Sequence, residues 1–171
     1  MPQIRWIADT VPASMRIRQV YCVMFDRLGR VLLRVIHKPE GGVRYSLAGG
    51  RPEPFDADPE ATCRRELLEE VNTEIETPLF IGYQLVNEED GTPPYAQPYA
   101  QVRMAALIRK IGIKRPDPDN GKTYDRLLVP PDKAAFLLNW GDVGRQQLLA
   151  AQQAIYPLYN ITEPTFSEEW V

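Results

Sequence analysis

Residues 64–72 read RRELLEEVN, which places three glutamates and two arginines in one short segment. Local signals for a helix flank this segment. Asp58 can cap a helix that begins at Pro59, and Asn72 can adopt the left-handed conformation that ends one. We therefore expect a helix over residues 59–71, and we expect the rest of the chain to be arranged around its charged side chains.

At about 100° per residue, this helix has an apolar arc and a charged arc. The apolar arc is expected to face a core and contains Ala61, Cys63, Leu67, Leu68 and Val71. The charged arc contains Arg65, Glu66, Glu69 and Glu70. Glutamates three or four positions apart repel one another by roughly 0.2–0.5 kcal/mol per pair, and a bound divalent cation would convert that repulsion into affinity. A solvated, charged helix face is the alternative interpretation of the same residues.

The composition suits one compact domain over residues 1–171, because 44% of the chain is hydrophobic and 25% is charged. A net charge of −3 without a long Lys/Arg run argues against a general nucleic-acid binder or a membrane-surface protein. No apolar run approaches the roughly 20 residues that span a bilayer, and the N-terminus lacks the apolar core of a signal peptide. A cytoplasmic location is therefore expected. Cys22 and Cys63 follow no metal-binding pattern and are predicted to be buried thiols.

Hydrophobic patterning predicts further strands and helices on both sides of this segment. The first two predicted strands are expected to form a hairpin, and the strands span residues 16–26, 31–37, 45–47, 79–86, 99–111 and 126–129. Two more helices are expected over residues 131–138 and about 143–156. An acidic loop is expected over residues 87–94, a short edge strand within residues 2–14, and a poorly ordered end after Pro157.

Two short motifs outside the helix are chemically distinctive. Ala48-Gly49-Gly50 lets the backbone come very close to a bound group, such as a metal ion or a phosphate. His37 is the only histidine, which excludes histidine-rich metal sites and leaves one candidate base for a Ser/His/Asp triad. Its position at the end of a predicted strand favours a solvent-exposed side chain.

The order of strand, Gly-Gly loop, acidic loop and Arg-Glu-Leu-Leu-Glu-Glu helix resembles the Nudix hydrolase family, whose box reads G-x5-E-x7-R-E-U-x-E-E-x-G-U, with U a bulky apolar residue. The box region spans residues 50–73. The residues that match in register are Gly50, Arg65, Glu66, Leu67, Glu69 and Glu70. The chain departs from the pattern at three places: the loop is one residue longer, Asp56 is the best substitute for the loop glutamate, and Asn72 and Thr73 replace the closing glycine and apolar residue.

This resemblance implies an α/β fold, a Nudix-type α/β/α sandwich with a mixed central sheet. It also implies a metal-dependent pyrophosphohydrolase, with Mg²⁺ or Mn²⁺, that cleaves a nucleoside diphosphate linked to another group. The substrate would be a small nucleotide-type molecule such as a nucleotide sugar, an ADP-ribose-like compound or a nucleoside triphosphate. One alternative is a Nudix-fold protein that binds a nucleotide or a partner with little or no turnover; another is a structural or interaction domain in which the box is coincidence. Whether the protein forms a homodimer is left open.

By position in the box, the resemblance implies that Glu66, Glu69 and Glu70 bind the metal, with the Gly49 carbonyl completing the shell. The implied catalytic residues are Glu69, Glu66 and Arg65, of which Arg65 orients Glu69 or a nearby carboxylate. Candidates for the general base are Glu69, Glu88 and Glu89. Four residues are candidates for substrate recognition from their aromatic or cationic character, although core packing or a surface role is the more common use of such residues: Trp6, Tyr99, Arg103 and Trp140.

Overall fold

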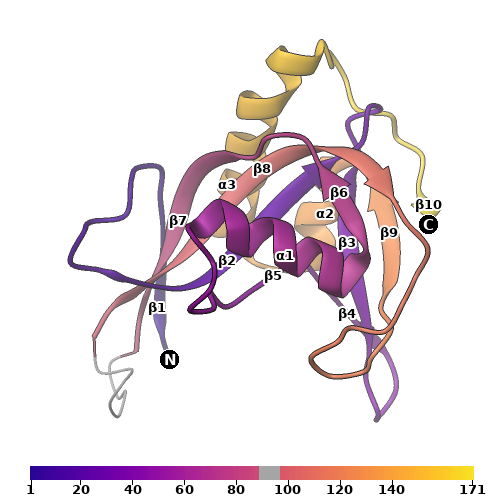
Figure 1. The fold of residues 1–171 in the computed structure, drawn as a ribbon. Helices are drawn as coiled ribbons and strands as arrows, with labels where there is room; N and C mark the ends of the chain where they lie inside the picture. Colours follow the sequence, from indigo (N-terminus) through magenta and orange to yellow (C-terminus); the bar gives the residue numbers. More distant parts are fainter. Residues whose placement is uncertain (89–96) are drawn as a thin grey trace.

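A mixed β-sheet forms the centre of the computed structural model, which describes residues 1–88 and 97–171. Figure 1 shows helix α1 across one face of the sheet, with α2 and α3 behind it. The helices are α1 (Pro59–Val71), α2 (Pro131–Leu138), α3 (Gly141–Ile155) and the short 3-10 helix η1 (Tyr156–Tyr159). The strands are β1 (Gln3–Ile7), β2 (Arg16–Phe25), β3 (Val31–His37), β4 (Val43–Ser46), β5 (Ala48–Gly50), β6 (Thr73–Ile75), β7 (Leu79–Asn87), β8 (Tyr99–Ile111), β9 (Asp125–Val129) and β10 (Glu169–Trp170). The predicted α/β/α sandwich is confirmed.

Strand β2 has different neighbours along its length. It runs parallel to β8 over nearly all of its residues, whereas β3 pairs with it only at Phe25↔Val31. Beyond that pair, β3 follows β9 and β4, and the short strand β5 pairs with β2 through Val20↔Gly50 and Tyr21↔Gly49. The predicted hairpin therefore exists only at its closing pair. The divergence of β3 from β2 leaves room for β5, whose two glycines lie beside α1.

The two faces of the sheet pack separate cores because successive strand residues point to opposite sides. On the side of α1, the core contains Cys22, Met24, Leu32, Cys63, Leu67 and Val71. On the side of α2 and α3, it contains Val23, Phe25, Leu33, Leu138, Leu148 and Ile155. Both cysteines are buried free thiols, as the sequence predicted.

Helix α1 has the predicted bounds, and its ends show why. The Asp58 Oδ1 atom accepts a hydrogen bond from the backbone N–H of Ala61 at 2.8 Å, and Asn72 adopts the left-handed conformation with φ 45°. The assignment of its faces needs two corrections. Leu68, on the predicted apolar arc, is exposed, and Glu66, on the predicted charged arc, is buried.

Several peripheral segments also differ from expectation. The C-terminal tail, predicted to be poorly ordered, forms β10, in which Glu169 pairs with Leu128 of β9. His37 is exposed as predicted, and its Nε2 atom lies 2.7 Å from Asp125 Oδ2. Most of the predicted acidic loop over residues 87–94 lies outside the described residues. Within residues 1–88 and 97–171, the structure contains no helix with the length and apolar character needed to span a membrane.

Candidate active site

Arg65 connects α1 to the loop that precedes it. The side chain of Arg65 makes two parallel hydrogen bonds to Asp56, from Nε to Oδ1 at 3.0 Å and from Nη2 to Oδ2 at 2.9 Å. Its Nη1 donates to Glu66 at 3.0 Å and to Glu69 at 2.9 Å, and Nη2 also donates to the Arg51 carbonyl at 2.8 Å. Arg65 therefore positions two of the helix carboxylates and holds the loop against them, whereas its role in catalysis stays a prediction.

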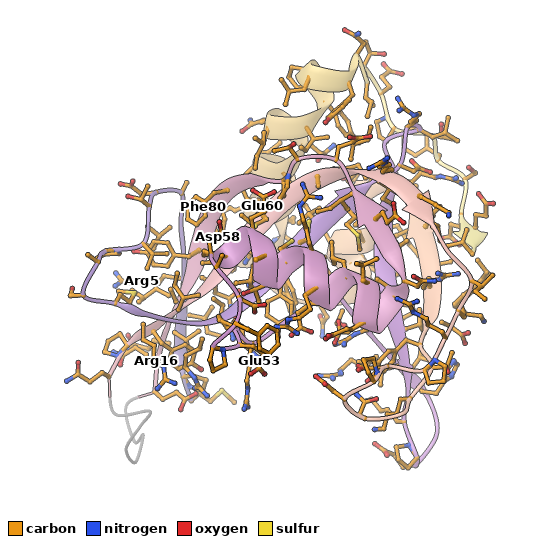
Figure 2. The ribbon with its side chains drawn as sticks, in the orientation of Figure 1. Arg5, Arg16, Glu53, Asp58, Glu60 and Phe80 are labelled. Atoms are coloured by element: carbon orange, nitrogen blue, oxygen red, sulfur yellow. The ribbon has the colours of Figure 1, made fainter. Side chains whose placement is uncertain are left out.

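Asp56, the substitute for the box glutamate, fixes the shape of this loop. Besides Arg65, its carboxylate accepts hydrogen bonds from the Thr62 hydroxyl at 2.8 Å and from the Glu53 backbone N–H at 2.9 Å. The Arg65 guanidinium and these donors hold the pKa of Asp56 well below its usual range. Figure 2 shows Glu53 in the loop and Asp58 where α1 begins. The loop, which is one residue longer than in the family pattern, is thus held to α1 by an aspartate in place of the glutamate.

Glu70 lies at the point where β3 diverges from β2. One carboxylate oxygen forms an ion pair with Arg34 of β3, and the other accepts the backbone N–H of Gly49 at 3.0 Å. Burial raises the pKa of Glu70 to about 7, although Arg34 and the Gly49 N–H act in the opposite direction. The structure shows this N–H contact, whereas a metal-binding role for the Gly49 carbonyl stays a prediction.

Glu66 packs against the backbone of Gly50. A Cβ atom added to Gly50 would lie 2.4 Å from the Glu66 carboxylate carbon, so only glycine leaves room for this carboxylate. Burial raises the pKa of Glu66, Arg65 opposes that shift, and the negative charges of Glu69 and Asp119 add to it. The carboxylate is therefore held in a desolvated position beside the loop.

The loop over residues 115–124 brings two more acids to this region, which the sequence analysis missed. The charge of Asp117 raises the pKa of Glu70, and the charge of Asp119 raises that of Glu66. Asp117 is buried and accepts hydrogen bonds from the Asp119 N–H and from the Asn120 side chain. Asp, Pro and Gly are the usual residues of turns, so the sequence offered no signal for this placement.

The helix carboxylates fit an open magnesium site better than a closed one. Within residues 1–88 and 97–171, no group of three His, Cys, Asp or Glu side chains is close enough to enclose a metal ion. Mg²⁺, however, usually binds one or two carboxylates and completes its shell with water and substrate phosphates. Glu66 and Glu70 are desolvated oxygen donors of this kind, and the charge of Glu66 raises the pKa of Glu70.

The remaining candidates separate into two groups. Arg103 and Trp140 line a cavity of about 260 Å³ whose other lining residues include Arg34, the partner of Glu70. Trp6 instead packs beside Gly82 of β7, and the Tyr99 hydroxyl donates to Glu88 at 2.9 Å. Glu88, a candidate general base that follows β7, is thus hydrogen-bonded to the first residue of β8. The other candidate base from this loop, Glu89, lies outside the described residues.

The chain is similar to known proteins at the level of the family and of the fold. The family model of the NUDIX domain matches residues 15–152. No curated protein matches the sequence. A mutant form of the Bacillus subtilis pyrophosphohydrolase BsRppH has a similar structure, with a TM-score of 0.65 and 19% identity over 90% of this chain and 92% of that one. A NUDIX hydrolase from Nitrosomonas europaea gives a TM-score of 0.55 and 15% identity, over 81% and 90% of the two chains. The TM-scores and coverages show a shared fold, and at these low identities they show the fold alone.

Proposed function

The chain belongs to the Nudix hydrolase family, whose members act on phosphoanhydride bonds, and we propose that it is a Mg²⁺- or Mn²⁺-dependent pyrophosphohydrolase that cleaves a nucleoside diphosphate linked to another group. The observation that carries this proposal is the pair of desolvated carboxylates, Glu66 and Glu70, that α1 presents to the Gly49–Gly50 strand. A solvated helix face would leave both side chains in water, whereas each is about 10% exposed.

Divalent metal, when bound, neutralises substrate phosphates and favours the attack of water on phosphorus. In this chain Glu66 and Glu70 would hold that ion, with Glu69 contributing directly or through water. Arg65 keeps the Glu66 and Glu69 carboxylates in place through its hydrogen bonds. Arg34 fixes the position of the Glu70 carboxylate through their ion pair.

Glu69 is the best candidate for the base that accepts a proton from the attacking water. Its side chain is 23% exposed, against about 10% for both Glu66 and Glu70. It can therefore reach water, while the hydrogen bond from Arg65, one helical turn earlier, limits its orientation. General-base catalysis contributes about 10²–10⁴-fold to a rate, so Glu69→Gln should lose activity in that range.

The alternative is a Nudix-fold protein that binds a nucleotide without cleaving it. One observation favours it: each helix carboxylate is already paired with an arginine, Glu66 and Glu69 with Arg65 and Glu70 with Arg34. Metal binding would have to compete with these ion pairs.

Hydrolysis of a substrate panel tests the proposal. The panel contains dinucleotides, nucleotide sugars and nucleoside triphosphates, with Mg²⁺, Mn²⁺ or a chelator, and phosphorus NMR identifies the products. We expect nucleoside monophosphate release that the chelator abolishes and that Glu69→Gln lowers about a hundredfold or more. Glu60→Gln, an exposed change on the same helix whose partner is Arg64, should leave the rate unaltered. Binding of panel members with no cleavage under any of these conditions would favour the alternative.

A further inference from the structure

The cavity on the α2 and α3 side contains a buried cation with neutral partners. Arg103 of β8 is 2% exposed, and its Nε and Nη2 atoms donate to the side-chain oxygens of Gln147 at 2.7 Å and Gln84 at 3.1 Å. Its guanidinium carbon lies 4.9 Å from the ring centre of Tyr21 and 5.4 Å from that of Trp140. No carboxylate among the described residues forms an ion pair with it. Buried charges are normally paired, but within residues 1–88 and 97–171 this guanidinium has no counterion.

The whole cavity is positively charged. Three arginines line it, and none of the described residues that line it is an Asp or Glu. Arg34 is neutralised by Glu70, but the exposed Arg44 has no carboxylate partner among the described residues. Burial lowers the pKa of Arg103 to about 10, which leaves it charged at neutral pH. With Arg34 and Glu70 cancelling each other, Arg44 and Arg103 give the cavity an excess positive charge.

The cavity adjoins the carboxylate site. Arg34 contacts Glu70 and lines the cavity at the same time. The hydroxyl of Tyr21 is close enough to both regions that Arg103 and Arg34 lower its pKa and Glu70 raises it, against a larger increase from burial. A molecule that reacts at α1 can therefore extend past Tyr21 into the cavity. A volume of about 260 Å³ is below the roughly 300–1,000 Å³ of pockets that enclose a whole ligand, so it suits one part of a larger molecule.

We propose that this cavity selects substrates that carry a further oxyanion, a phosphate monoester or a carboxylate, outside the diphosphate that is cleaved. Arg103 supplies the deep charge that pairs with the oxyanion, and Arg44 supplies a second charge at the rim. This inference rests on the proposed function, because it takes the diphosphate to lie at Glu66 and Glu70. A neutral group such as a base could also accept hydrogen bonds from Arg103, but it would add no counterion for the two arginines, which have none among the described residues.

Equilibrium binding of two matched pairs of molecules tests this proposal. NADP⁺ differs from NAD⁺ by one phosphate monoester, and UDP-glucuronate differs from UDP-glucose by one carboxylate. Titration calorimetry in the presence of a chelator measures binding without turnover. A charge-assisted hydrogen bond is worth about 1.5–3 kcal/mol, so the charged member of at least one pair should bind about ten- to a hundredfold more tightly. The pair that shows the preference identifies the oxyanion.

Variants locate the preference in the cavity. Arg103→Gln and Arg44→Gln should each reduce the ratio of the two affinities, by about tenfold or more for Arg103→Gln. Because Arg44 is exposed, its variant stays informative if Arg103→Gln fails to fold. Arg5→Gln, an exposed change on β1 outside the cavity lining, should leave the ratio unaltered (Figure 2).

Equal affinities within both pairs, or no binding of either charged molecule, would overturn the proposal. A preference that survives both Arg44→Gln and Arg103→Gln would overturn it as well. These outcomes are separate from those of the hydrolysis test. A preference for the charged molecule without any cleavage would refute the proposed activity alone, whereas cleavage without that preference would refute only the role of the cavity.

Discussion

Asp56→Asn tests whether the short acid in the box loop holds that loop to α1. The Asp56 side chain is 5% exposed and accepts four hydrogen bonds, two from Arg65 and one each from Thr62 and the Glu53 N–H. Asparagine keeps the size of the side chain but removes its charge and one of its two acceptors. The substitution therefore removes the ion pair while it leaves the packing of the side chain unchanged.

The expected loss of stability follows from these contacts. Breaking a buried ion pair costs about 3–5 kcal/mol, but Arg65 keeps Glu66 and Glu69 as partners, so we expect about 2–4 kcal/mol. For a chain of this length each kcal/mol lowers the melting temperature by about 2–4 °C. Asp56→Asn should thus melt roughly 5–15 °C below the wild type.

The difference should also depend on pH in a defined direction. Arg65 lowers the folded-state pKa of Asp56 below its unfolded-state value, which is about 3.9. The ion pair therefore stabilises the fold fully above that value, and its contribution is lost as the pH falls through the folded-state pKa. The gap between the two proteins should be constant from pH 5 to 8 and should shrink below about pH 4.

Urea and thermal unfolding at several pH values measure this gap. Asp58→Asn is the matched control, because the same substitution two positions away retains a good helix cap and should cost less than about 0.5 kcal/mol. If Asp56→Asn unfolds with the same free energy as Asp58→Asn, the loop is not held by this ion pair and the reasoning is wrong.

Three further predictions concern the site and the core. Gly50→Ala should displace the Glu66 carboxylate and lower hydrolysis at least about tenfold, while circular dichroism shows an intact fold; unchanged activity would mean that Glu66 is not needed where it lies. Mn²⁺ affinity, measured by EPR, should fall as the pH is lowered below about 7, because a proton competes for Glu70; a constant affinity from pH 6 to 8 would contradict this. The thiols of Cys22 and Cys63 are buried, so they should react with a thiol reagent only when the protein unfolds, and rapid labelling of the native protein would count against the packing of α1 on β2.

Local signals explain which elements could be predicted from the sequence. The bounds of α1 were predicted correctly because Asp58, Pro59 and Asn72 act within one turn of its ends. The same holds for α2, which begins at Pro131 and ends before Asn139 in the left-handed conformation. Signals of this kind depend on neighbouring residues and need no knowledge of the tertiary structure.

Contacts between distant segments explain the failures. The pairing of β2 with β8 joins residues more than 80 positions apart, and no local turn sequence predicts it. Glu66 is buried because Gly50, across the loop, leaves space for its carboxylate. A helical projection of α1 could not show this contact, so it placed Glu66 outside and Leu68 inside.

The sequence motif indicates candidate site residues only as far as the box extends, and their roles stay predictions. Arg65 and the three glutamates were found by motif, but their arginine and backbone partners come from other elements. Arg103 was a candidate only through its chemical type, and its burial among neutral partners became visible with the fold. The acids Asp117 and Asp119 were hidden in a sequence that is typical of turns.

Glu70→Gln tests most directly whether the carboxylates of α1 are the site of metal binding and hydrolysis. The measurement is kcat/KM for a diphosphate that the wild type cleaves with Mg²⁺, compared among wild type, Glu70→Gln and the control Glu60→Gln. We predict that Glu70→Gln loses roughly a hundredfold or more in activity, while Glu60→Gln stays within about twofold of the wild type. Equal activity of Glu70→Gln and Glu60→Gln would show that the carboxylates of α1 are not the site of hydrolysis.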